Sequence, residues 1–278
     1  MTSRPEGQRL DQVLVQRGLA RSRGHARELL ARGVVDVDGR PVSKPAAAVT
    51  AEHRVEVRDA GPTWVSRAAE KLVGALAAFG APGQPGGIDP RGQRCLDAGA
   101  STGGFTQVLL HHGAAEVVAL DVGHGQLAEP VRSDPRVVEL SGTTVRGLTP
   151  EQIGGPVTLV VADLSFISLT LVLADLARVL SPEGEAVVLV KPQFEVGRER
   201  LGKNGIVRRA GDRAWAVTQV AEAAREAGLH PRELAASPVR GGEGNAEYLL
   251  WLTRDGTRAM GWETLVSLAD TLSLEGVP

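Results

Sequence analysis

The stretch LDAGASTGGFT, residues 96–106, decides the fold of this 278-residue chain. Apolar residues lead into a glycine-rich run of small residues, and a helical pattern begins at its end. A strand, a glycine turn and a helix in that order form the ligand-binding edge of an open α/β sheet. Glycine lets the backbone approach a ligand, and a helix N-terminus favours a negative group. The ligand-contacting residues expected here are Asp97, Gly99, Ala100, Ser101, Thr102, Gly103, Gly104, Phe105 and Thr106.

Several known glycine loops compete for this stretch. A phosphate-binding loop needs lysine and then serine or threonine after the last glycine, where Phe105 stands. A dinucleotide fingerprint needs a second glycine two residues after Gly99, where Ser101 stands. Residues 99–103 do spell Gly-x-Ser-x-Gly, the nucleophile turn of many hydrolases, but the only late histidine is His230, in a Leu-His-Pro turn. A structural turn without a ligand also stays open.

Apolar runs and helical patterns alternate after residue 93. The expected strands are 94–98, 116–122, 137–140, 157–162 and 186–190, followed by two more at 232–236 and 248–252. A helix over 66–79, capped by Ser66, precedes them, another covers 212–227, and a last one follows Trp262. This alternation predicts a doubly wound, Rossmann-like α/β sheet. Its last two strands would form an antiparallel hairpin at the edge.

Acidic residues end two of the expected strands at the edge where ligands bind. Asp121 ends the second strand and is placed to accept hydrogen bonds from the hydroxyls of a ribose. Asp163 follows the strand at 157–162. Because strands often end in aspartate at a turn, each carboxylate alone indicates little. Combined with the glycine turn, Asp121 favours a ligand that carries a ribose.

The chain has only four lysines, so the position of each is informative. Lys191 follows five apolar residues at the end of a strand, where it either reaches solvent or serves a site. Lys71 lies on the helix before the sheet, and Glu247 enters the last strand. For Lys71 and Glu247, an ordinary solvated charge is the alternative interpretation.

Residues 1–59 read as a small α+β unit, joined by a linker over 60–64 to a larger unit over 65–278. Helical patterns at 10–19 and 23–32, the second capped by Ser22, precede strands at 34–37, 40–42 and 55–57. The first 60 residues hold 11 Lys+Arg against 8 Asp+Glu, although the whole chain has a net charge of −2. This asymmetry indicates that the small unit faces a polyanion.

Composition narrows the remaining possibilities. No apolar run is long enough to span a membrane, and residues 1–6 lack the apolar stretch of a signal peptide. The single cysteine, Cys95, fits a reducing cytoplasm and reads as a core thiol rather than a nucleophile. We expect no metal site, no membrane partner and a monomer.

Together these segments resemble the TlyA family of ribosomal RNA 2′-O-methyltransferases, some members of which are labelled haemolysins. The similarity covers essentially the whole chain. It is carried by RLD at 9–11, GLARSR at 18–23, GVVDVDG at 33–39, VSRAAEKL at 65–72, residues 97–106, ADLSFISL at 162–169, KPQFE at 191–195 and GNAEY at 244–248.

The resemblance implies an S-four-type RNA-binding domain followed by an FtsJ-type class I methyltransferase domain. It implies S-adenosylmethionine as cofactor, bound by the 97–106 turn, Asp121 and Asp163. It implies a Lys-Asp-Lys-Glu tetrad at Lys71, Asp163, Lys191 and Glu247, and methylation of cytidine 2′-hydroxyls in 23S and 16S ribosomal RNA within ribosomal subunits. RNA contacts are expected at Arg9, Arg21, Ser22, Arg23, Arg27 and Arg67.

The chain departs from the family pattern in four places. Ala68 stands where the family often has glycine, and 143–145 reads TTV rather than TNV. Residues 241–243 read GGE without the frequent proline, and the linker reads PTWV at 62–65. These departures touch the linker and the fit of the substrate rather than the tetrad.

Two roles are open for Lys191. A lysine acts as general base only when burial or a second cation, here Lys71, lowers its pKa. A carboxylate against it, expected to be Asp163, opposes that lowering, so the lysine could instead orient the hydroxyl and stabilise a developing alkoxide. Glu247 would hold Lys71. The rival class is a non-enzymatic RNA-binding or lytic protein, which the complete donor turn and tetrad argue against.

Overall fold

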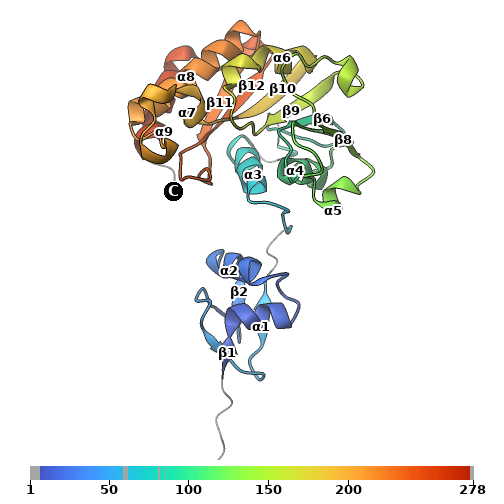
Figure 1. Ribbon diagram of the computed structural model, residues 1–278, viewed down its shortest axis with the longest axis vertical. Helices are drawn as coiled ribbons and strands as arrows, with labels where there is room; N and C mark the ends of the chain where they lie inside the picture. The colour runs from blue at the N-terminus through green and yellow to red at the C-terminus, as the bar shows by residue number, and fades with distance from the viewer. Residues whose placement is uncertain (1–6, 59–61, 81, 85, 276–278) are drawn as a thin grey trace, which may run out of the picture. The chain divides into compact units, whose positions relative to one another are not determined.

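The computed structural model describes residues 7–58, 62–80, 82–84 and 86–275 (Figure 1). The chain divides into two compact units, Met1–Thr63 and Trp64–Pro278. Residues 1–6, on which the expectation about a signal peptide rests, lie outside the described part.

The N-terminal unit packs two short helices on small antiparallel sheets. Its core is formed by apolar side chains of both helices and of the strands, among them Leu10, Leu14, Leu30 and Val35. Ser22 caps the second helix as predicted, because its hydroxyl accepts a hydrogen bond from the His25 N–H at 3.2 Å. The elements are β1 (Gln8–Arg9), α1 (Leu10–Gln16), α2 (Arg23–Ala31), β2 (Val35–Val37), β3 (Arg40–Pro41), β4 (Ala48–Val49) and β5 (Val55–Val57).

The C-terminal unit is built on one seven-stranded sheet of order β11-β12-β10-β9-β6-β7-β8. The strands from β8 to β10 are parallel, and β12 runs antiparallel to both β10 and β11, so the predicted edge hairpin is confirmed. The strands are β6 (Arg94–Ala98), β7 (Glu116–Asp121), β8 (Val137–Ser141), β9 (Val157–Ala162), β10 (Leu180–Val190), β11 (His230–Ala236) and β12 (Tyr248–Thr253).

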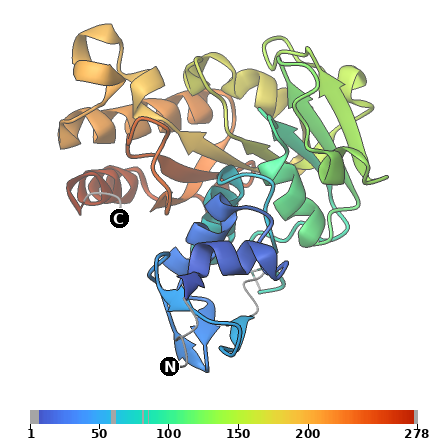
Figure 2. The ribbon, with the colours of Figure 1, turned by 60° about the horizontal axis from the view of Figure 1, so that its bottom comes forward.

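Helices cover both faces of this sheet (Figures 1 and 2). Alternate residues of each central strand enter opposite cores: Cys95 packs on the side of α3 and α4, and Leu96 packs on the side of α6, α8 and α9. Cys95 is fully buried, as expected for a core thiol. The helices are α3 (Ala68–Ala78), α4 (Gly104–His111), α5 (Glu129–Arg132), α6 (Leu173–Val179), α7 (Pro192–Glu195), α8 (Ala210–Glu226) and α9 (Trp262–Glu275).

Two local predictions were wrong. The helix before the sheet begins at Ala68 without a side-chain cap, and the Ser66 hydroxyl is buried with no hydrogen-bond partner. Ser66 instead packs against α4, where a Cβ added to Gly104 would lie 2.3 Å from its hydroxyl oxygen. The strand β10 begins at Leu180 rather than at residue 186, because pairing with β9 and β12 extends it.

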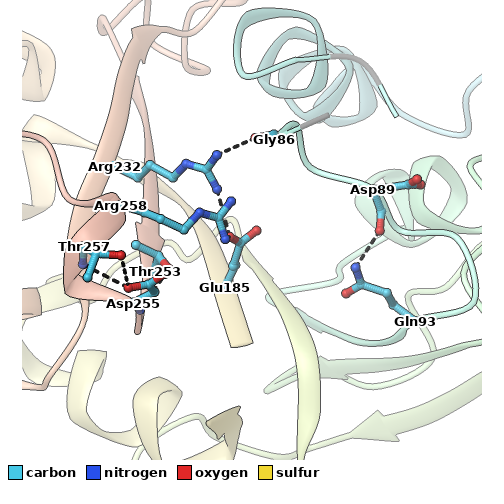
Figure 3. Close-up of polar contacts among 9 residues, drawn as sticks. All are labelled: Gly86, Asp89, Gln93, Glu185, Arg232, Thr253, Asp255, Thr257 and Arg258. Atoms are coloured by element: carbon cyan, nitrogen blue, oxygen red, sulfur yellow. Dashed lines mark hydrogen bonds and ion pairs between the residues drawn. The ribbon is translucent and has the colours of Figure 1, made fainter. Parts of the chain in front are cut away.

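A cluster of charges contacts the middle of β10. Glu185 lies between Arg232 of β11 and Arg258, at 3.0 and 2.7 Å (Figure 3). Arg232 also donates to the Gly86 carbonyl and lies 3.7 Å from the centre of the Trp251 ring. The cluster therefore ties the loop before β6 and the edge hairpin to β10, away from the strand ends that carry the site.

No helix in the described ranges is long and apolar enough to cross a membrane.

Candidate active site

The sheet topology brings four charged side chains to one place. Lys191 follows β10 directly, and Asp163 follows the neighbouring strand β9. Glu247 precedes β12, which pairs with β10 on its other side and runs in the opposite direction. Lys71 reaches the same point from α3. Segments that are far apart in sequence therefore meet at the end of β10.

These four side chains form two ion pairs, and a third contact connects the two. The Lys191 Nζ lies 2.7 Å from Asp163 Oδ1, and the Lys71 Nζ lies 2.7 Å from Glu247 Oε2. Asp163 Oδ2 is 3.7 Å from the Lys71 Nζ, so this carboxylate lies between the two ammonium groups. The side chains are 2 to 12% exposed. Charges buried this deeply are stable only when they are paired. Here two lysines pair with two carboxylates, so the cluster carries no net charge.

Ser165 completes the surroundings of Lys191. The Lys191 Nζ donates a hydrogen bond to the Ser165 hydroxyl at 2.8 Å. The sequence pattern contained Ser165 only as part of a longer motif and gave it no role. Its contact depends on how the loop after β9 folds back towards β10, which no local pattern encodes.

Two neighbouring cavities open at this edge of the sheet. The larger, of about 620 Å³, is lined by the four charged side chains, the glycine turn and Phe105. The smaller, of about 420 Å³, is lined by Asp121, Val122, Thr144 and Ile167 among others. Both cavities share the residues Gly99, Ser101, Asp163, Ser165 and Phe166. A ligand in the smaller cavity would therefore reach the edge of the larger one beside Asp163.

The smaller cavity fits a nucleoside. Asp121 holds the turn, since its carboxylate accepts hydrogen bonds at 2.8 Å from the N–H groups of Ser101 and Gly123. Each carboxylate oxygen has a further lone pair for a ribose hydroxyl. The apolar side chains of Val122, Leu164 and Ile167 suit a flat ring. Gly99 is required here, because its φ is +86° and an added Cβ would lie 2.7 Å from the Asp163 carbonyl oxygen.

Three residues expected to contact the ligand line neither cavity: Asp97, Gly103 and Thr106. Asp97 is fully buried and accepts hydrogen bonds from the N–H and the hydroxyl of Thr106, at 2.8 and 2.6 Å. Burial raises the pKa of Asp97 to about 7, despite those hydrogen bonds. Gly103 has φ +90° and packs against Val131. These residues shape the turn from behind the two cavities.

A hydrolase triad is excluded by the position of His230. This histidine starts β11 and pairs with Thr253, at the far end of β12 from Tyr248. Tyr248 pairs with Val190 beside the site, so Ser101 and His230 lie at opposite ends of the sheet. None of the described residues lining the two cavities is a histidine.

Comparisons with known proteins identify the family. A model of FtsJ-like methyltransferases matches residues 64–254, and a model of the S4 domain matches residues 8–55. The 16S/23S rRNA (cytidine-2′-O)-methyltransferase TlyA of Mycobacterium tuberculosis is 54% identical over 253 residues, which are 91% of this chain and 92% of that protein. The chain belongs to the TlyA family.

Two further relatives agree with membership of the TlyA family. Hemolysin A of Brachyspira hyodysenteriae is 36% identical, over 87% of this chain and 98% of its own. A solved structure described as a hemolysin from Streptococcus thermophilus matches with a TM-score of 0.71 and 33% identity, covering 98% of this chain and 96% of that one. The chain is thus an FtsJ-like methyltransferase with a Rossmann-like sheet and an N-terminal S4 domain, for which S-adenosylmethionine is the methyl donor.

In this TlyA-family chain three arginines of the S4 domain surround one carboxylate. Asp11 is fully buried, and Arg9, Arg23 and Arg27 approach it at 3.0, 3.2 and 3.5 Å. The neighbouring Arg9 guanidinium, which hydrogen-bonds this carboxylate, lowers the pKa of Asp11 to about 2. Since the arginine side chains are 43 to 58% exposed, the cluster presents three guanidinium groups to solvent over a single negative charge.

The other residues expected to bind RNA lie elsewhere. Arg21 is exposed, and its backbone N–H donates to His25 at 3.2 Å. Ser22 is occupied as the cap of α2. Arg67 is exposed in the C-terminal unit, where it donates to the Arg240 carbonyl at 3.4 Å.

Proposed function

We propose that this protein methylates the ribose 2′-hydroxyl of cytidines in ribosomal RNA of the large and the small subunit, in the cytoplasm and as a monomer. The observation that carries this proposal is Asp163, which lies between the ammonium groups of Lys71 and Lys191 in a wall shared by both cavities. The M. tuberculosis relative, a 16S/23S rRNA (cytidine-2′-O)-methyltransferase by name, supports the choice of substrate.

Each of the two cavities would hold one reactant. S-adenosylmethionine supplies a methyl group on a sulfonium when it is bound. Asp121 and the apolar side chains of Val122 and Ile167 would hold its nucleoside in the smaller cavity. The target ribose would enter the larger cavity, with its 2′-hydroxyl beside Lys191 and in line with the methyl group. Positioning of this kind supplies much of the rate of a displacement reaction.

Lys191 has donors to offer the substrate. A protonated lysine has three N–H donors; one binds the Ser165 hydroxyl, and the ammonium group forms an ion pair with Asp163 at 2.7 Å. A further N–H can orient the ribose oxygen and stabilise the negative charge that develops on it. The contact with Asp163 favours this role over that of a general base. Lys71, fixed by Glu247, is placed to hold the target ribose or its phosphate.

Phe166 fits an RNA substrate. Phe166 is 92% exposed, which is unusual for a large apolar residue. Its backbone has φ +64°, which is uncommon for a bulky residue. Its ring lies 5.4 Å from that of Phe194, at the junction of the two cavities. Proteins that recognise RNA commonly splay a base out and stack it on such a side chain. The pair of rings is therefore suited to hold a base next to Lys191.

We expect the purified protein to transfer tritium from labelled S-adenosylmethionine to ribosomal subunits that lack the modification. Each subunit is tested separately, and the label is then mapped to the nucleotide and to base or ribose. Transfer to cytidine ribose in both subunits supports the proposal in full, and transfer to one subunit corrects its range. Label on a base, or no transfer to either subunit, contradicts it.

We expect the arginine cluster at Asp11 to dock the RNA. Changing Arg23 and Arg27 to glutamine should weaken binding to ribosomal subunits and reduce the slope of log affinity against log salt by about 1 to 2, since each phosphate contact contributes ~0.7 to 0.9. Arg54→Gln is the matched control, because this exposed arginine of the same unit forms its ion pair with Glu56, at 2.6 Å, and lies outside the cluster at Asp11. Filter binding across a salt series measures the slopes. Equal slopes for both variants and the wild type would show that the cluster is merely solvated.

A further inference from the structure

A basic loop borders the catalytic cavity. Residues 197–209, here called the basic loop, connect α7 to α8 and present five exposed cationic side chains: Arg198, Arg200, Lys203, Arg208 and Arg209. Leu201, Asn204 and Gly205 of this loop line the same cavity as the Lys71–Asp163–Lys191–Glu247 cluster. The sequence patterns assigned no role to this segment.

Asn245 holds the basic loop from below. Its side chain is buried, with the residue only 4% exposed. Its Oδ1 accepts a hydrogen bond from the Val207 N–H at 3.0 Å, and its Nδ2 donates to the Gly205 carbonyl at 3.1 Å. Both ends of the amide are thus used on the loop backbone. Removing a buried group with this many partners leaves those partners unsatisfied, which costs more than the hydrogen bonds contribute.

The segment that carries Asn245 also carries part of the catalytic cluster. Glu247, two residues further on, pairs with Lys71 at 2.7 Å. The Asn245 carbonyl accepts from the Gly241 N–H at 2.9 Å, and a Cβ on Gly241 would lie 2.5 Å from Glu247 Oε1. One tight turn therefore fixes a member of the ion-pair cluster and the anchor of the basic loop.

Most charges of the basic loop are available to a ligand. Arg200 is engaged, because its guanidinium lies 4.3 Å from the centre of the Trp215 ring and 3.6 Å from Asp212. Within the described ranges, the side chains of Arg198, Lys203, Arg208 and Arg209 form no ion pair. Exposed cations without carboxylate partners beside an RNA-accepting cavity match the phosphates of the RNA backbone.

We propose that Asn245 is a positioning residue that holds the basic loop against the catalytic cavity, where the loop binds phosphates of the RNA strand around the target nucleotide. The inference rests on the proposed function, since it takes RNA as the substrate. Asn245 also lines the larger cavity, but both ends of its side-chain amide are used on the loop backbone, so it acts through the loop. Its removal should therefore weaken RNA binding while the donor site keeps its affinity.

The first test is Asn245→Ala. We expect KM for ribosomal subunits to rise by about tenfold, with a much smaller change in kcat, because uniform binding is lost. Affinity for S-adenosylmethionine, measured by calorimetry, should stay unchanged, and trypsin should cleave faster after the basic residues of the loop. Ser237→Ala is the matched control: this side chain is also buried between β11 and β12, but its hydroxyl hydrogen-bonds with the backbone of Val239, to whose carbonyl it donates and from whose N–H it accepts.

The second test asks whether Asn245 and the charges of the basic loop act together. Arg208→Gln with Arg209→Gln changes only exposed side chains and should raise KM for ribosomal subunits by about tenfold. Adding Asn245→Ala to this pair should raise KM by a smaller factor than Asn245→Ala does alone, since two of the four available charges of the loop are already gone. If Asn245→Ala does not fold, Asn245→Asp serves, because it keeps the acceptor for Val207 and loses the donor for Gly205.

Several results would overturn the inference. One is an unchanged KM for ribosomal subunits in a folded Asn245 variant. Another is full additivity of the Asn245 and arginine changes, and a third is an equal loss of affinity for S-adenosylmethionine. Failure of the wild-type protein to methylate ribosomal RNA would instead refute the proposed function. Wild-type activity with any of the three results above refutes only the role of Asn245.

Discussion

Lys191→Ala should reduce methyl transfer to ribosomal RNA by a factor of about 100 or more, while the protein still folds and binds S-adenosylmethionine. The reason is positional. Lys191 is a buried cation that contacts Asp163 and Ser165 and lines the larger cavity. Removing it takes away the group that orients the ribose hydroxyl, but not the walls of the smaller cavity, which it does not line.

Single-turnover tritium transfer measures this effect, with calorimetry for the donor and thermal unfolding for the fold. Lys44→Ala is the control, since Lys44 is an exposed lysine of the N-terminal unit. Its removal should leave stability within about 0.5 kcal/mol of the wild type. Full activity in Lys191→Ala would show that the lysine is only a structural partner of Asp163.

A companion variant separates the two roles of Lys191. Arginine keeps the positive charge but cannot lose its proton at neutral pH. Residual transfer by Lys191→Arg well above that of Lys191→Ala would support a fixed cation that stabilises the oxygen. Equal loss in both variants, with small amines restoring Lys191→Ala in proportion to their unprotonated fraction, would support a general base.

Gly99→Ala should abolish binding of S-adenosylmethionine and, with it, methyl transfer. Gly99 has φ +86°, a conformation that costs an L-residue about 1 to 2 kcal/mol. The larger effect is steric, because the new Cβ would lie 2.7 Å from the carbonyl oxygen and 3.1 Å from the carbonyl carbon of Asp163. Backbone must move there, at a point that lines both cavities and carries the carboxylate between the two lysines.

Gly228→Ala separates this steric effect from backbone strain. Gly228 has φ +76° at the end of α8, and a Cβ there would meet nothing within 4 Å. The two variants should lose similar stability from strain, but only Gly99→Ala should lose the donor. Calorimetry and denaturant unfolding measure the two quantities. Wild-type affinity in Gly99→Ala would mean that the turn yields without disturbing the cavities.

The sheet could be predicted from the sequence because its signals are local. Continuous apolar strands such as 157–162 are buried on both faces, and short loops connect them to helices with an apolar stripe. The cap at Ser22 also depends only on near neighbours. The same holds for the turn at Asp38 and Gly39, where both residues have positive φ. The order of the strand ends then places Asp163 and Lys191 side by side.

The sequence by itself determined the fold class, the glycine turn and the charged residues at the strand ends, because patterns with periods of two or 3.6 residues record burial directly. Only the tertiary structure decided what these residues contact. In the folded chain Asp97 is buried in the core, and Lys191 donates a hydrogen bond to Ser165. Three arginines surround Asp11, and the side chain of Asn245 accepts a hydrogen bond from the basic loop. Such contacts join segments far apart in the chain, and they exist only once packing has brought the buried polar groups close enough to satisfy one another.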